Sequence, residues 1–180
     1  MGSYRRLALT FLLTVTVLAV CGRGATQSLA AGGEVGPSGF AVRNGTITGG
    51  NLASLQAADR NFLHVDPSSG TNPYRFILSA RFDGVPNEAT WLFVWQTGTA
   101  DPGSARCDHF AFSERTRRYE RTGGSLFDAE YRTAGGILYE PFNQWVSGES
   151  GAGRVLLKFK CRARAPYVLH LDRLTVEWTT

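Results

Sequence analysis

The sequence predicts an all-β protein: a single antiparallel β-sandwich of jelly-roll type that follows an N-terminal signal peptide. Several segments alternate apolar and polar residues with a period of two, turn-forming residues separate them at short intervals, and helical periodicity is almost absent. A chain of 180 residues accommodates one domain with a hydrophobic core. We place this domain at residues 40–180 and expect eight or nine strands.

The first thirty residues have the layout of a secretory signal. A basic start, Met1–Arg6, precedes the apolar run Leu7–Cys21, and small residues follow as far as Ala30. We expect cleavage after Ala30, a secreted mature protein and no membrane span after cleavage, because the run is shorter than the roughly 20 residues of a spanning helix. A retained anchor and a cell-surface lipoprotein attached at Cys21 are the less favoured alternatives, the latter because Val20 replaces the usual small residue.

The net charge argues against a nucleic-acid ligand. The chain has 19 Lys and Arg against 15 Asp and Glu, a formal charge of +4. The signal segment holds Arg5, Arg6 and Arg23 and no acidic residue, so its removal leaves 16 basic against 15 acidic residues, a net charge of +1. An almost neutral mature chain predicts no nucleic-acid partner.

The strands are predicted from residue parity. Residues 31–39, rich in Gly, Ala, Pro and Ser, indicate a flexible lead. Alternation predicts strands at 74–82, 127–132 and 154–162, and the segment Trp91–Trp95, apolar at every position, is typical of a central strand covered on both faces.

The remaining elements are shorter or irregular. We expect strands at 46–48, 62–65 and 110–112, and turns at Gly123-Gly124 and Gly135-Gly136. The apolar parity shifts by one residue between 167–171 and 174–178, which predicts a β-bulge or a corner at Asp172-Arg173.

The cysteines predict one disulfide. Cys21 leaves with the signal, so the exported chain retains Cys107 and Cys161 as an even pair in an oxidising compartment. Two separate buried thiols are the alternative. A pair without CxxC spacing or nearby histidines does not make a zinc site.

Five segments together resemble a known module: 54–65, 82–86, 106–107, 142–148 and 155–161. Their order is similar to that of the galactose-binding-like, carbohydrate-binding-module sandwiches of secreted bacterial multidomain proteins. The resemblance implies a β-sandwich with a structural disulfide at positions matching Cys107 and Cys161. The Arg-rich segment 114–121 departs from the more neutral, aromatic hairpin of that module, so the resemblance implies a fold and no particular ligand.

No constellation of residues predicts catalysis. Asp128 and Glu130 lie two residues apart on one strand face and could supply the acid and base of glycoside chemistry, but a solvated face is the simpler interpretation. His64, His109 and His170 are dispersed. We therefore predict no catalytic residue and no enzyme.

Two groups of residues are candidates for ligand binding. Sugar rings pack their CH faces on flat aromatic rings, and their hydroxyls need a few fixed polar partners. Trp145 follows Asn143 and Gln144 in a predicted loop near Tyr139, where an exposed ring with amide neighbours would suit a sugar. The alternative is that Trp145 plugs the end of the sandwich, while Trp91, Trp95 and Trp178 look like core residues.

The second group is a basic ribbon on one strand face, consisting of Arg154, Lys158, Lys160 and Arg162. It could hold carboxylated or sulfated glycans or cell-wall phosphates. The alternative is cross-strand pairing with acidic residues such as Asp128 and Glu130.

The leading hypothesis is a secreted, monomeric, non-catalytic carbohydrate-binding-like protein that recognises an extracellular or cell-surface polysaccharide. The alternative is a structural or adhesive envelope-associated protein without a small ligand, and a small hydrolase or lyase comes third. No cofactor is expected. A structural calcium ion is an open alternative, with hard oxygen ligands available from Asp172 and Glu177 or from Asp59 and Asp66.

Overall fold

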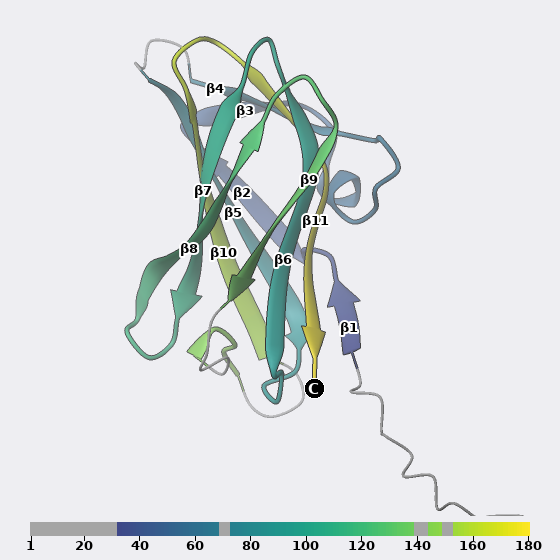
Figure 1. Cartoon of the computed structure of the whole chain (residues 1–180), viewed down its shortest axis with the longest axis vertical. Coiled ribbons are helices and arrows are strands. Elements are labelled where there is room, and N and C mark those ends of the chain that lie inside the picture. Colours follow the sequence, from purple (N-terminus) through teal and green to yellow (C-terminus); the bar gives the residue numbers. More distant parts are fainter. Residues whose placement is uncertain (1–31, 69–72, 139–143, 149–152) are drawn as a thin grey trace, which may run out of the picture.

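The computed structural model describes residues 32–68, 73–138, 144–148 and 153–180, which form two antiparallel sheets packed face to face (Figure 1). The six-stranded sheet has the order β3-β4-β11-β6-β9, with β1 beside β11, and the five-stranded sheet has the order β2-β5-β10-β7-β8. The predicted β-sandwich is confirmed. The predicted signal peptide lies outside the described residues, and within them no helix is long and apolar enough to cross a membrane.

The chain passes repeatedly between the two sheets, as in a jelly roll. The strands are β1 (Gly32–Val35), β2 (Gly39–Arg43), β3 (Gly45–Gly49), β4 (Leu63–Pro67), β5 (Tyr74–Val85), β6 (Trp91–Asp101), β7 (Ala105–Ser113), β8 (Arg118–Phe127), β9 (Arg132–Leu138), β10 (Gly153–Ala163) and β11 (Val168–Thr179). One short 3₁₀ turn, η1 (Leu52–Leu55), precedes β4. Edge strands β8 and β9, one from each sheet, lie side by side at the front of Figure 1.

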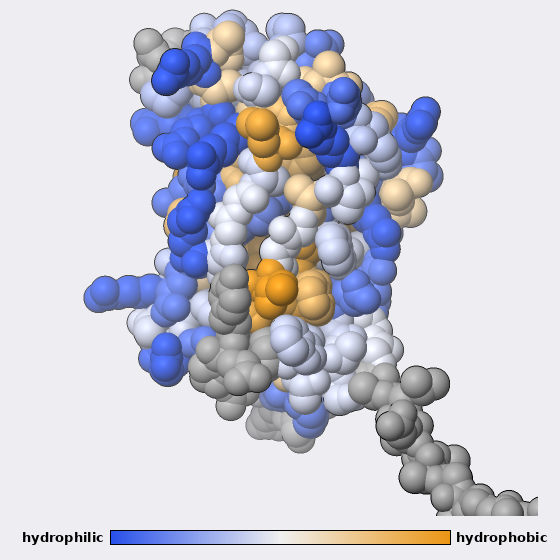
Figure 2. Space-filling model, in the orientation of Figure 1, coloured by the Kyte–Doolittle hydropathy of each residue, from blue (hydrophilic) through white to orange (hydrophobic). Residues whose placement is uncertain are grey.

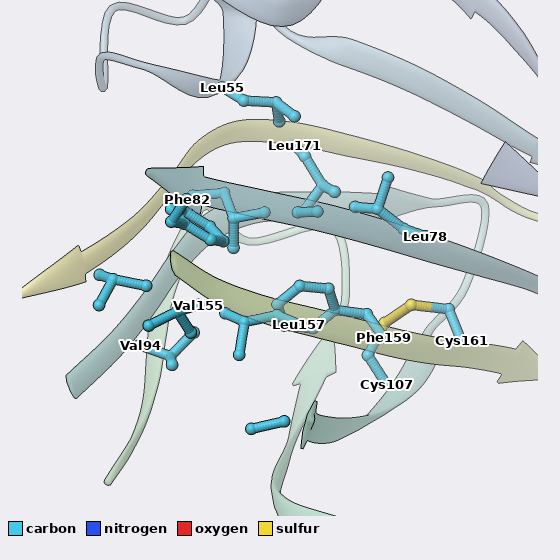
Figure 3. Packing of buried hydrophobic residues seen from close by; sticks show 14 of the residues in the cluster. Leu55, Leu78, Phe82, Val94, Cys107, Val155, Leu157, Phe159, Cys161 and Leu171 are labelled. Carbon is cyan, nitrogen blue, oxygen red and sulfur yellow. A yellow bond between two sulfur atoms is a disulfide. The ribbon is translucent and has the colours of Figure 1, made fainter. Parts of the chain in front are cut away.

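Alternation along the strands creates the core, as the sequence predicts. On β5 and β10 every second residue faces inward, and Phe76, Phe82 and Phe159 are almost completely buried. Figure 3 shows Phe82 and Phe159 among the inward side chains that meet between the sheets. Each fully buried side chain of this size contributes about 1.5–3 kcal/mol relative to an exposed one, so the core is the main source of stability.

The predicted disulfide is confirmed. Cys107 of β7 and Cys161 of β10 are directly opposite residues in the five-stranded sheet, and their sulfur atoms are 2.01 Å apart. Both side chains are buried, and the bridge lies beside Phe159 in the core (Figure 3). It ties together two strands that are 54 residues apart in sequence.

The predicted β-bulge is also confirmed. The pairing of β11 with β6 shifts between Leu171 and Arg173, so Leu171 and Leu174 both reach the core. The bulge buries Asp172, whose carboxylate accepts a hydrogen bond from the backbone N–H of Arg60 at 2.7 Å and another from the hydroxyl of Tyr131. These partners compensate the burial of its charge.

Three local predictions are wrong. Residues 32–35, expected to belong to a flexible lead, form β1, where Gly33 lies opposite Trp178; a β-carbon on Gly33 would come within 2.4 Å of the indole. The strand predicted at 127–132 is interrupted, because β8 ends at Phe127 and the next residues turn, with Glu130 N–H donating to Asp128 Oδ1 at 3.0 Å.

The third wrong prediction concerns the glycine pairs. Gly123-Gly124 lies within β8 and Gly135-Gly136 within β9, and neither is a turn. At Gly135 the indole of Trp95 leaves no room for a β-carbon, and at Gly124 a β-carbon would lie 3.2 Å from the carbonyl oxygen of Cys107.

Candidate functional site

Strand β6 presents a row of three aromatic rings on the outer face of the six-stranded sheet. Trp91, Phe93 and Trp95 alternate with the buried Leu92 and Val94, and Trp91 is 49% exposed. The ring centroids of Trp91 and Phe93 are 6.2 Å apart with an interplanar angle of 16°, and those of Phe93 and Trp95 are 6.1 Å apart with an angle of 7°. The prediction of a strand covered on both faces is therefore wrong: β6 is covered on one face only.

Trp95 lies along the sheet rather than standing away from it. One edge of its indole is so close to Gly135 of β9 that a β-carbon there would be 2.5 Å from Cε3 and Cζ3. On the other side, indole Nε1 donates a hydrogen bond of 2.7 Å to Glu177 of β11. The ring thus spans three neighbouring strands, β9, β6 and β11.

A hollow of about 450 Å³ opens beside the row. Phe93, Trp95 and Ile137 supply its apolar lining, and the two glycine pairs of β8 and β9 contribute bare backbone. Figure 2 shows hydrophobic atoms in the middle of this face, where β9 and β6 lie, and hydrophilic side chains along the side formed by β7 and β8. A planar apolar surface with polar borders is what the CH face of a sugar ring requires.

Polar groups flank the rings on the same face. Glu177, which holds Trp95, is directly opposite Glu34 of β1, and Glu34 pairs with Arg173. Further along the sheet, the hydroxyls of Thr97 and Thr133 are 3.0 Å apart. Thr97 is buried, but Thr133 is exposed, so carboxylate oxygens and one hydroxyl lie on the face that carries the rings and can bond to sugar hydroxyls.

A buried histidine supports the glycine-rich side of the hollow. His109 Nε2 contacts the amide of Gln96 and lies 3.0 Å from Ser125 Oγ, whereas Nδ1 has no hydrogen-bond partner within the described ranges. A β-carbon at Gly136 would be 3.7 Å from this Nδ1, and one at Gly123 would be 3.8 Å away. Burial lowers the pKa of His109 to about 4, so its ring is neutral at pH 7.

Of the loop residues predicted to bind a ligand, the two that the structure describes are buried. Trp145 is 5% exposed and belongs to the hydrophobic core, and Gln144 is also buried. Trp145 therefore has the alternative role considered from the sequence: it fills the end of the sandwich. Tyr139 and Asn143 lie outside the described residues.

The predicted basic ribbon lies on the outer face of the five-stranded sheet. Arg154 Nε is 3.0 Å from Asp83 Oδ1, and Arg162 is 3.3 Å from Asp108. Lys158 and Lys160 lie over the rings of Tyr119 and Phe110, at 3.7 and 4.5 Å from the centroids.

The predicted pairing of this ribbon with Asp128 and Glu130 is wrong. Both carboxylates contact Arg132, at 3.1 and 2.6 Å. They belong to the turn after β8, so they never come opposite β10 in the sheet.

Two of the three histidines lie together, and the described residues hold no metal-binding cluster. His64 Nδ1 and His170 Nδ1 are 2.6 Å apart on β4 and β11, while His109 lies in the other sheet. Across the described ranges, no group of three or more His, Cys, Asp and Glu residues could hold a metal ion. Asp172, one of the proposed calcium ligands, already binds Arg60 and Tyr131.

Comparison with known proteins supplies structural neighbours only. No protein family and no curated protein matches the sequence. A family 61 carbohydrate-binding module in complex with β-1,4-galactotriose is 11% identical, over 78% of this chain and 89% of that chain, with a TM-score of 0.43. The family 11 carbohydrate-binding module of a Clostridium thermocellum cellulosomal cellulase is 14% identical, over 84% and 89%, with a TM-score of 0.42.

A third neighbour is the N-terminal cellulose-binding domain of Cellulomonas fimi β-1,4-glucanase C. It is 16% identical, over 81% of this chain and 91% of that chain, with a TM-score of 0.42. At such low identities and TM-scores these neighbours assign neither a family nor a ligand to this chain.

Proposed function

We propose that the protein binds a polysaccharide without cleaving it, and that the sugar chain lies on the outer face of the six-stranded sheet. The observation that carries this proposal is the row Trp91, Phe93 and Trp95 on β6, with three nearly parallel rings on the solvent side of the sheet. Solvent-facing aromatic rings in an ordered row are costly to leave in water unless a ligand covers them.

The surroundings of the row suit a sugar chain better than a flat apolar partner. Glu177 fixes the orientation of Trp95, and Glu34 and the exposed Thr133 offer hydrogen bonds on the same face of the sheet. The hollow over the β9 glycines gives a ring substituent room beside Trp95. Apolar stacking supplies affinity in this arrangement, and the polar border supplies specificity.

The absence of cleavage is part of the proposal. Asp128 and Glu130 are engaged by Arg132, and His109 is enclosed by the core. We expect the release of no reducing ends from any polysaccharide that the protein binds. Turnover that disappears when Asp128 is replaced would contradict this part and favour the hydrolase alternative.

Export also belongs to the proposal, because the polysaccharide that we propose as the ligand lies outside the cell. It is motivated by the charge and apolar pattern of residues 1–30. Recovery of the protein from the culture medium with an N-terminus at Ala31 would support it. Retention of an intact N-terminus inside the cell would contradict it.

Binding to a panel of soluble neutral polysaccharides tests the central claim, using affinity electrophoresis and calorimetry on the protein. Trp95→Ala should weaken binding about tenfold or more, since it removes the ring that spans β9, β6 and β11 and lines the hollow. Leu126→Ala is the matched control, because Leu126 is an exposed apolar residue of the five-stranded sheet, away from the row. Equal affinity in the two variants, or no binding to any member of the panel, would overturn the proposal; a protein partner recovered by crosslinking would then favour the adhesive alternative.

A further inference from the structure

The opposite face of the sandwich carries an unusual concentration of arginine. Arg162 of β10 is directly opposite Arg75 of β5 on one side and Arg106 of β7 on the other, so three guanidinium groups form one row across three strands. Like charges placed directly opposite each other in a sheet are destabilising. An anion that offsets this positive charge therefore stabilises such a row.

The protein supplies one carboxylate to this row. Asp108 lies 3.6 Å from Arg106, 2.9 Å from Arg121 and 3.3 Å from Arg162. The hydrogen bond from Arg121 and the nearby positive charges lower the pKa of Asp108, which is therefore ionised at pH 7. One negative charge is shared by three cations, which leaves most of their charge uncompensated.

Lys160 adds one further cation beside the row, and Arg75, within the row, lacks a charged partner among the described residues. Lys160 is the neighbour of Arg162 on the same face of β10 and contacts the ring of Phe110. Within the described part of the chain, the Arg75 side chain makes no ion pair or hydrogen bond. Both residues keep their positive charge exposed to solvent.

The basic face also carries two hollows. One, of about 420 Å³, is lined by Arg75, Lys160 and Arg162 together with Asp108 and Asn44. A second, of about 410 Å³, is lined by Arg106 and Arg121 at the β8 edge. Two cation-lined hollows on one face fit an extended chain that carries several negative groups better than a single small anion.

We propose that this face, defined by Arg75, Arg106, Arg121, Lys160 and Arg162, is a second binding site that takes an acidic polysaccharide. Guanidinium groups bind the planar or tetrahedral oxyanions of carboxylated and sulfated sugars through paired hydrogen bonds. This proposal rests on the proposed function only for the class of ligand, a polysaccharide. The site itself consists of different residues, on the five-stranded sheet.

Matched charged and uncharged polymers test the site. Dextran sulfate is compared with dextran for the sulfate group, and polygalacturonate with its methyl ester for the carboxylate group. Binding of at least one charged member, weakening steeply between about 50 mM and about 300 mM salt, is expected, and the uncharged members should not bind this face. Equal binding of charged and uncharged members would overturn the proposal.

Charge-neutralising variants locate the site. Arg75→Gln and Arg162→Gln should each weaken binding of the charged polymer about fivefold, whereas the matched control Arg118→Gln, an exposed arginine at the start of β8, should change it less than about twofold. Arg75→Gln removes no ion pair or hydrogen bond among the described residues, so its result stands even if Arg162→Gln impairs folding. Equal effects of Arg75→Gln and Arg118→Gln would show diffuse attraction and overturn the assignment.

Two outcomes separate this site from the aromatic surface and from nucleic-acid binding. Trp95→Ala should leave binding of the charged polymer unchanged, so failure of the aromatic surface and failure of the basic face are distinguishable. A single-stranded DNA oligonucleotide that competes as strongly as the charged polysaccharide would reject a sugar ligand in favour of a nucleic acid.

Discussion

The indole of Trp95 rests directly on the backbone of Gly135, its partner across strands β6 and β9, at a distance that admits no β-carbon. The aromatic surface therefore depends on a glycine in the neighbouring strand. Both groups lie on the outer face of the sheet. Their contact therefore orients the indole without taking part in the packing of the core.

We predict that Gly135→Ala weakens polysaccharide binding about tenfold, since the new methyl group would push the indole off the sheet. Gly136→Ala is the matched control: its methyl would meet His109 Nδ1 at 3.7 Å, an ordinary contact distance, on the opposite face. Calorimetric titration with the best ligand of the neutral panel measures both. Equal losses in the two variants would show that β9 itself, and not the position of Trp95, controls affinity.

The core position of Trp145 leads to a second prediction. Trp145→Ala should lower the free energy of unfolding by about 3–5 kcal/mol, as expected for a large buried ring, and the variant that remains folded should keep its affinity for polysaccharide. Urea denaturation followed by fluorescence gives the stability. A stable Trp145→Ala variant that has lost binding would return the binding site to the loop predicted from the sequence.

The disulfide leads to a third prediction. Replacing Cys107 and Cys161 with alanine should lower the free energy of unfolding by about 4 kcal/mol, because the bridge closes a loop of 54 residues in the unfolded chain. Thermal unfolding with and without a reductant measures the change, and the wild-type protein in reductant should match the double variant. An unchanged melting temperature would show that strand pairing alone holds β7 against β10.

A fourth prediction concerns acid stability. Burial lowers the pKa of His109 to about 4, with Asp108 opposing the shift and Arg121 adding to it. In the unfolded chain His109 binds a proton near pH 6.5, whereas in the folded chain it stays neutral down to about pH 4. Its contribution to the free energy of unfolding is therefore fully present above about pH 6.5. As the pH falls toward about 4, up to about 3 kcal/mol of stability is lost.

His109→Gln should flatten this pH dependence in denaturant titrations. Burial and the neighbouring His64 also lower the pKa of His170, which contributes in the same direction, so His170→Gln is measured in parallel. The carboxyls of Asp83 and Asp108, whose pKa values are lowered, lose their contributions only as the pH falls below about 4. An unchanged slope in His109→Gln would mean that folding does not lower the pKa of His109.

The sequence predicts the parts of this fold that depend on local pattern. Residue parity predicts the strands β5 and β10 and the bulge at Asp172. The expected oxidising compartment predicts the pairing of Cys107 with Cys161. The aromatic surface could not be predicted in the same way. A strand that is apolar on both faces has the same pattern whether its second face meets another layer or solvent, and β6 meets solvent.

The glycines show the same limit at the site itself. As sequence, Gly135-Gly136 indicates a turn, and only the pairing of β9 with β6 shows that Gly135 lies beneath an indole. The basic ribbon, in contrast, is visible from parity along β10, but Arg75 and Arg106 join it through strand pairing over long sequence separations. The sequence does contain one cue to the aromatic surface: aromatic residues occupy every second position of β6. This spacing is compatible with an outward row as well as with a buried one.

The last prediction concerns Asp108, which acts as an internal counter-ion of the basic face. Asp108→Asn removes the one carboxylate shared by Arg106, Arg121 and Arg162, so it should raise the affinity for the charged polymer at least about twofold at low salt. The same change should lower the free energy of unfolding by about 1–2 kcal/mol, because Arg121 loses its charged acceptor. Opposite signs for binding and stability identify a ligand-binding role, since a purely structural ion pair would leave polymer affinity unchanged or reduce it along with stability.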